Sequence, residues 1–230
     1  MDVQPTRGGL RLSQHGVVIS EIRLKPGPTH SIFDVLAALV AVAGPAGRVG
    51  ILGFAGGGMM APLRRLGFSG LVEAVDLDWV SHELFVRHCC GWAGPVNWHH
   101  GDAVDWLRSQ QRDFSVLVED LSVPLAGDVF KPEVSWDVLP QLMAERLSLG
   151  GVAILNQIPR KNGDWPLTWA GFGRQLGPVL TVRLDDFENR ILVTGQSIGT
   201  ARGLGARLRE ALRVLGSRQA DRLQVRTGLG

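Results

Sequence analysis

The chain has 230 residues, of which 45% are apolar and 20% are charged, and its formal net charge is +2. This is the composition of an ordinary globular protein, and it excludes a disordered, collagen-like or coiled-coil chain. No stretch approaches the roughly 20 apolar residues of a membrane span, and the N-terminus has neither the basic start nor the apolar run of a signal peptide. We therefore expect a cytoplasmic protein with no membrane partner, and so small a net charge does not indicate a nucleic-acid partner.

Residues 1–44 are predicted to form a short N-terminal hairpin and helix. Polar and apolar residues alternate across residues 10–24 around His15-Gly16, which is typical of a β-hairpin. Apolar residues then recur at helical spacing over residues 32–42, and Gly44-Pro45 ends this helix.

Residues 45–199 are predicted to form the main domain. Strands are expected at 49–54, 71–77, 96–99, 114–120 and 152–156, with helical stretches between them. This alternation implies a parallel α/β sheet with helices on both faces. Residues 179–184 and 190–194 look like a closing antiparallel hairpin, which gives a seven-stranded, mostly parallel sheet with a C-terminal antiparallel hairpin.

Residues 200–230 are predicted to form a basic C-terminal helix or tail. The segment carries seven arginines against two acidic residues, on a mildly acidic body. Leu204, Leu208, Leu212 and Leu215 share one helical face. Two interpretations are open: a helix packed on the domain, or a mobile basic arm that contacts a partner or nucleic acid.

The residue pattern does not predict a metal site. The two cysteines, Cys89 and Cys90, are neighbours, so a disulfide between them would strain the backbone and they cannot form a zinc site of the usual spacing. His99 and His100 are also adjacent, and adjacent residues of a strand point to opposite faces. We expect buried, reduced cysteines and no bound metal.

The strongest functional signal is a predicted nucleoside site. The glycine-rich run 53–58, with the pattern Gly53-x-Ala55-x-Gly57, follows the first strand of the main domain and precedes a helix. Such a loop turns sharply and brings backbone N–H groups close to a ligand. Asp76 ends the next strand, where a carboxylate can accept both ribose hydroxyls, and Asp102 follows the third strand. Together these positions favour a nucleoside at the carboxyl edge of the sheet.

These segments resemble those of spermidine synthases, which are polyamine aminopropyltransferases within the class I S-adenosylmethionine-dependent methyltransferase superfamily. Residues 51–58 resemble the glycine motif, residues 75–78 the ribose-binding segment, and residues 101–107 the adenine segment. Residues 114–124 are similar to the stretch that holds the catalytic aspartate. The resemblance covers about residues 30–195.

The resemblance implies a Rossmann-like class I methyltransferase fold and binding of S-adenosylmethionine or decarboxylated S-adenosylmethionine. The implied cofactor-binding residues are Gly53, Ala55, Gly57, Asp76, Leu77, Asp102 and Ala103. Asp120 is implied as the catalytic residue that deprotonates a small amine acceptor, with Glu119, Ser122 and Gln157 as substrate contacts. Spermidine synthases commonly dimerise, so a homodimer is a further expectation.

The chain also departs from the family pattern. Val123 stands where the family has a second aspartate, Gly56 stands where the glycine motif carries one, and the chain contains no tyrosine, which the family uses in its amine pocket. Three functions therefore remain open. They are a spermidine synthase-like transferase with a different, less cationic acceptor, a plain methyltransferase, and a non-catalytic member that binds a nucleoside or a partner.

Overall fold

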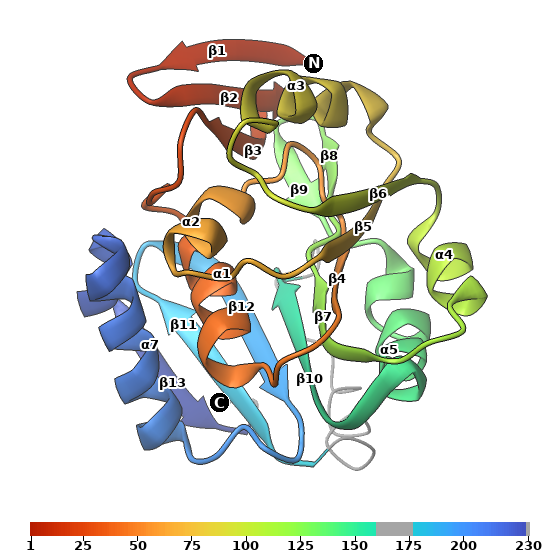
Figure 1. Cartoon of the computed structure of the whole chain (residues 1–230), viewed down its shortest axis with the longest axis vertical. Coiled ribbons are helices and arrows are strands. Elements are labelled where there is room, and N and C mark those ends of the chain that lie inside the picture. Colours follow the sequence, from red (N-terminus) through yellow and green to blue (C-terminus); the bar gives the residue numbers. More distant parts are fainter. Residues whose placement is uncertain (160–176, 229–230) are drawn as a thin grey trace.

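The computed structural model describes residues 1–159 and 177–228. Its centre is an eight-stranded sheet with the strand order β13-β11-β12-β10-β7-β4-β5-β6 (Figure 1). Its strands are β4 (Val49–Leu52), β5 (Val72–Asp76), β6 (Val96–His100), β7 (Phe114–Glu119), β10 (Leu147–Gln157), β11 (Val179–Leu184), β12 (Phe187–Thr194) and β13 (Leu223–Thr227). In this sheet β10, β7, β4, β5 and β6 run parallel to one another. Strands β12, β11 and β13 follow on the other side of β10, and each pairs antiparallel with its neighbours. The predicted fold class, a mostly parallel sheet with a closing antiparallel hairpin, is confirmed.

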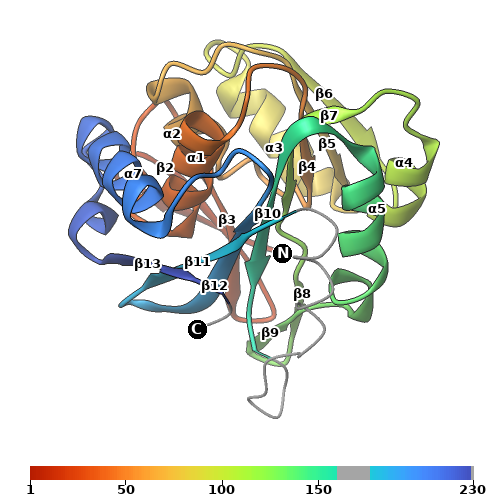
Figure 2. The same ribbon diagram turned by 90° about the horizontal axis from the view of Figure 1, so that it is seen from below.

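Helices cover both faces of this sheet (Figure 2). On one face lie α1 (Ile32–Ala43), α2 (Met60–Arg65) and α7 (Ala201–Leu215), and on the other lie α4 (Ala103–Ser109) and α5 (Val138–Arg146). Each face has its own buried apolar cluster, with Leu39 and Leu208 in the first and Leu107 and Leu139 in the second. Within the described part of the chain, no helix is both long enough and apolar enough to cross a membrane.

The C-terminal helix α7 is packed on the domain and is not a mobile arm. Leu204, Leu208 and Leu212 are fully buried, as expected for an apolar helical face turned toward a core. One basic side chain also holds the helix in place, because Arg207 Nη1 donates to the carbonyl oxygen of Val42 at the end of α1, at 2.8 Å.

The last strand, β13, was not predicted. It pairs antiparallel with β11 at the edge of the sheet. Its sequence, Leu-Gln-Val-Arg-Thr, does alternate apolar and polar residues, but the run is only five residues long and lies in a segment that was expected to be a helix or tail. The described sheet therefore has eight strands where the sequence indicated seven.

The N-terminal residues form a second, three-stranded antiparallel sheet of β1 (Asp2–Thr6), β2 (Gly9–Gln14) and β3 (Val17–Arg23), and β3 packs against α3 (Trp79–Cys89). β2 and β3 are the predicted hairpin, whereas β1 is exposed along its length and gave no apolar pattern. Leu12 and Ile22 are buried against the glycine-rich loop. A Cβ at Gly56 would lie 2.7 Å from Leu12 Cδ1 and 3.1 Å from Ile22 Cγ1. This sheet therefore forms part of the wall around that loop.

The two cysteines of α3 differ in environment. Cys89 is buried, as expected, and burial raises the pKa of its thiol to about 12. Cys90 is exposed, contrary to the expectation, because it follows the last residue of α3 and turns away from the core.

We predict that the packing of α7 contributes to stability. Leu208→Ala leaves a cavity in the core and is expected to lower the free energy of unfolding by about 2–5 kcal/mol, as measured by urea denaturation. The control is Val214→Ala on the same helix, where the side chain is 62% exposed, and the expected change is below about 0.5 kcal/mol. Equal, small effects of both variants would contradict the packed helix.

Candidate functional site

The candidate site lies where the order in which the chain adds strands to the sheet reverses. From β4 the chain continues outward to β5 and β6, then returns to β7 on the other side of β4. Open α/β sheets bind ligands at the carboxyl ends of strands at such a point. A pocket with a volume of about 710 Å³ lies there, lined by the glycine-rich loop, the ends of β5 and β7, and the N-terminal sheet.

The glycine-rich loop needs its special residues for backbone reasons. Gly53 has φ +89°, and a Cβ there would lie 2.7 Å from the carbonyl oxygen of Asp120, so the ends of β4 and β7 approach too closely for a side chain. Ala55 also has a positive φ of 43°. Its N–H donates to Asp76 Oδ2 at 2.6 Å, which ties the loop to the end of β5.

Asp76 retains hydrogen-bonding capacity on the pocket side. Its Oδ1 accepts from the backbone N–H of Asp78 at 2.7 Å, and its Oδ2 accepts from Ala55. A carboxylate has about four acceptor positions, so each oxygen can take one more donor. Asp76 lines the pocket and can therefore accept two hydroxyl groups, the number that a ribose would offer.

Asp102 caps α4. Its Oδ1 accepts from the N–H groups of Val104 at 2.8 Å and Asp105 at 3.1 Å. Its Oδ2 makes no hydrogen bond within the described residues, and the side chain lines the pocket. The capping role and the predicted ligand role are therefore compatible. Leu77 and Ala103 also line the pocket, whereas Gly57 does not, and its N–H donates to the carbonyl of Phe54 at 2.8 Å.

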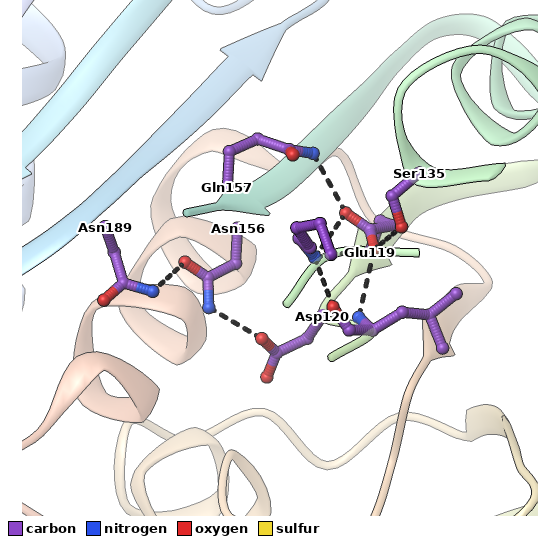
Figure 3. Close-up of polar contacts among 8 residues, drawn as sticks. Glu119, Asp120, Ser135, Asn156, Gln157 and Asn189 are labelled. Carbon is purple, nitrogen blue, oxygen red and sulfur yellow. Dashed lines mark hydrogen bonds and ion pairs between the residues drawn. The ribbon is translucent and has the colours of Figure 1, made fainter. Parts of the chain in front are cut away.

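Asp120 lies at the end of β7 and is held by a chain of two amides (Figure 3). Asn156 Nδ2 donates to Asp120 Oδ1 at 2.7 Å, and Asn189 Nδ2 donates to Asn156 Oδ1 at 2.9 Å. Loss of solvent around Asp120 raises its pKa to about 6, against the lowering effects of Lys131 and of the Asn156 hydrogen bond. Asp120 is thus an oriented carboxylate that takes up a proton as the pH falls through about 6.

Glu119 and Gln157 face away from the pocket. Glu119 is fully buried and accepts from Lys131 Nζ at 2.7 and 2.9 Å, from Ser135 Oγ at 2.9 Å and from the N–H of Leu121 at 3.0 Å. Gln157 Nε2 donates to the same carboxylate at 3.1 Å (Figure 3). Neither side chain lines the pocket, so the structure does not bring these two predicted substrate contacts to Asp120.

Ser122 lines the pocket, and so do Lys131 and Asn189, which the sequence did not single out. Lys131 is one of only three lysines among 24 basic residues. The rarity of lysine in this arginine-rich chain was the one sequence feature that could have drawn attention to Lys131. Its partner, Glu119, lies 12 residues earlier, and no spacing rule connects the two.

A second hairpin, next to the N-terminal sheet, supplies Val123, Pro124 and Val129 to the pocket wall. β8 (Val123–Leu125) and β9 (Asp128–Phe130) form a two-stranded sheet that the sequence did not predict, at the same end of the molecule as β1–β3 (Figure 1). The two hairpin turns meet, because the N–H of Gly127 donates to the carbonyl of His15 at 2.9 Å. Both turns have two consecutive residues with positive φ, the backbone of a type I′ turn.

Solved structures with this architecture include spermidine synthases and a methyltransferase. A probable spermidine synthase from Corynebacterium glutamicum ATCC 13032 has a TM-score of 0.72 and 16% identity over 98% of this chain and 86% of that one. A spermidine synthase in complex with the transition state analogue AdoDATO has a TM-score of 0.65 and 13% identity over 86% and 74%. Human methyltransferase-like protein 13, in complex with SAH, has a TM-score of 0.60 and 18% identity over 82% and 92%.

No family model and no curated protein matches the sequence. At such low identities the structural likeness establishes the fold. The chain has the fold that spermidine synthases share with class I methyltransferases, which agrees with the resemblance found in the sequence.

We predict that Lys131 is needed to keep Glu119 in the interior. Lys131→Met leaves a buried carboxylate without its cation and is expected to lower the free energy of unfolding by about 3–5 kcal/mol. The double variant Glu119→Gln/Lys131→Met removes both charges and is expected to regain most of that loss. Urea denaturation at pH 7 measures both, and an equal loss in the two variants would show that the ion pair has no such role.

Proposed function

We propose that this protein is a transferase that binds S-adenosylmethionine or decarboxylated S-adenosylmethionine and alkylates a small amine acceptor. The observation that carries the proposal is one shared pocket, in which Asp120 lies beside Gly53 and Asp76. The neighbouring structures that hold SAH and AdoDATO support a ligand of this class.

The residues present fit such a ligand. Asp76 has a free acceptor position on each oxygen for the two ribose hydroxyls. Asp102 Oδ2 is available to an adenine amino group, and Leu77 and Ala103 provide apolar surface beside it. Gly53 and Ala55 hold the loop against Asp76 without side chains that would fill the pocket.

Asp120 supplies the acid–base chemistry. A bound sulfonium group would supply an electrophilic carbon and a neutral thioether leaving group, because the carbon–sulfur bond breaks with its electron pair going to sulfur. Asp120 orients the ammonium of the acceptor and takes its proton, which frees the nitrogen lone pair to form the new carbon–nitrogen bond. The Asn156 hydrogen bond fixes the carboxylate in one orientation, and positioning of this kind lowers the barrier by pre-aligning the reactants.

Methyl transfer is the second candidate, and Gly56 favours it. The resemblance places a family aspartate at this position, near the sulfonium end of the ligand. Here Leu12, Ile22 and Ser20 occupy the space that a side chain would need, since a Cβ would lie 2.7–3.1 Å from their atoms. The ammonium of a decarboxylated donor therefore has no carboxylate at this position, whereas the ammonium of intact S-adenosylmethionine has the carboxylate of the ligand itself beside it.

We predict that Asp76 carries much of the nucleoside affinity. Asp76→Ala is expected to weaken binding of S-adenosylmethionine, its decarboxylated form and methylthioadenosine by about 10–100-fold, because two hydrogen bonds to ribose are lost. The control Asp105→Ala changes an exposed residue of the same charge at the start of α4 and is expected to bind normally. Calorimetric titration measures all three ligands.

The same titration decides between the candidates. Tighter binding of the decarboxylated ligand supports aminopropyl transfer, and tighter binding of intact S-adenosylmethionine supports methyl transfer. No binding of any of the three ligands to the wild-type protein would overturn both.

We predict that Asp120 acts as the base. Asp120→Asn keeps the size and the hydrogen bond from Asn156 and is expected to lower kcat by about 10²–10⁴-fold while the nucleoside Kd stays the same. Because Asp120 accepts a proton only when it is ionised, wild-type kcat is expected to rise with pH through about 6. Steady-state rates from pH 5 to 8 test this, and an unchanged kcat in the variant would exclude Asp120 as the base.

A further inference from the structure

The part of the pocket beyond the nucleoside end contains few charged groups. At the nucleoside end, Asp76, Asp78 and Asp102 line the pocket, and each already accepts at least one backbone N–H group. Toward the acceptor, the charged residues of the described lining are Asp120, Glu21 and Lys131. Within the described lining, a charged group that recognises the acceptor therefore has to be one of these three.

Two of these three charges are already paired within the protein. Lys131 is 3% exposed and forms its ion pair with the fully buried Glu119. Glu21 forms a cross-strand ion pair with Arg11, at 3.3 Å between the nearest atoms. Asp120 accepts a hydrogen bond from the neutral amide of Asn156 and, among the described residues, has no cation within ion-pair distance. On the acceptor side of the described lining, Asp120 is thus the carboxylate that remains unpaired and can bind an incoming cation.

The remaining walls carry no charge and are mostly apolar, with a few neutral polar side chains such as Ser20, Ser122 and Asn189. The apolar residues come from several elements. They include Ile19 of β3, Phe33 of α1, Val129 of β9 and Phe187 of β12, together with Val134 and Ile158. An ammonium placed against such surfaces loses its hydration without gaining a partner, which is costly. A hydrocarbon or aromatic group placed there is favoured, because its surface leaves water.

We propose that the acceptor is a monoamine with an apolar body, an alkylamine or arylalkylamine whose single ammonium binds Asp120. This inference rests on the proposed function and narrows its substrate class. A diamine of the same length would place its second ammonium among uncharged, mostly apolar side chains, where the described lining offers it no unpaired carboxylate. The Glu119–Lys131 ion pair then contributes to the selection of a monoamine over a diamine. Lys131 neutralises the charge of Glu119, which would otherwise be a second negative charge beside Asp120.

The test compares n-pentylamine with 1,4-diaminobutane, which have equal chain lengths and differ in whether a methyl group or an ammonium ends the chain. Each amine is titrated calorimetrically into the protein saturated with methylthioadenosine, so the result does not depend on turnover. Pentylamine is expected to bind at least about tenfold more tightly. Equal or tighter binding of the diamine, or no binding of either amine, would overturn the proposal.

Failure of the proposed function is seen separately in the same experiment. If methylthioadenosine itself does not bind, the nucleoside site is refuted and the acceptor inference falls with it. If methylthioadenosine binds and the amine preference is reversed, the proposed function stands and only the acceptor class is wrong.

Two variants test the charge argument directly. Val123 lines the pocket on β8 and is 49% exposed, so Val123→Asp adds a carboxylate without burying it. This variant is expected to raise the affinity for 1,4-diaminobutane by about tenfold, whereas the matched Val123→Asn is not. Glu21→Gln is expected to leave both amines unaffected. A loss of diamine binding in Glu21→Gln would identify a second ammonium site and contradict the proposal.

Discussion

The buried ion pair between Lys131 and Glu119 is the interaction on which the acceptor side of the pocket depends. Lys131 Nζ donates to both oxygens of Glu119 and, at 2.6 Å, to the carbonyl of Leu121, so the loop after β7 is tied to the segment after β9. Ser135 and Gln157 attach two further segments to the same carboxylate. Apolar residues of similar volume would often be as stable as a buried ion pair. Its value here is positional, because it fixes the backbone on either side of Asp120.

The sequence was sufficient for features that depend on short stretches of chain. The apolar runs predicted β4, β5, β7 and β10, and the glycine-rich loop with Asp76 and Asp102 follows from the rule that parallel strands end at one edge. Glu119 and Gln157 show where such reasoning stops. Whether a polar side chain at a strand end faces the pocket or the interior depends on a partner elsewhere in the chain, and the partner of Glu119 reaches it only through the β8–β9 hairpin.

The N-terminal sheet explains one departure from the family pattern. Leu12 and Ile22 pack against the loop at Gly56 and leave no space for a side chain there. The same packing therefore explains why position 56 has no carboxylate. The same sheet supplies Ile19 and Glu21 to the pocket and meets the β8–β9 hairpin at His15. A short N-terminal region thus forms a wall of the site, although its sequence showed only a hairpin.

The identity of the buried cation also limits the acceptor. An ammonium has three donors, and those of Lys131 are matched by two carboxylate oxygens and one carbonyl at 2.6–2.9 Å. None is left for a ligand, although the side chain lines the pocket. Lys131 therefore acts on the site only through its field, which opposes a second ammonium and restrains the rise in the pKa of Asp120. An acceptor that bears its own carboxylate would find no free cation in the described lining, which leaves the neutral-bodied amine as the class that this charge arrangement fits.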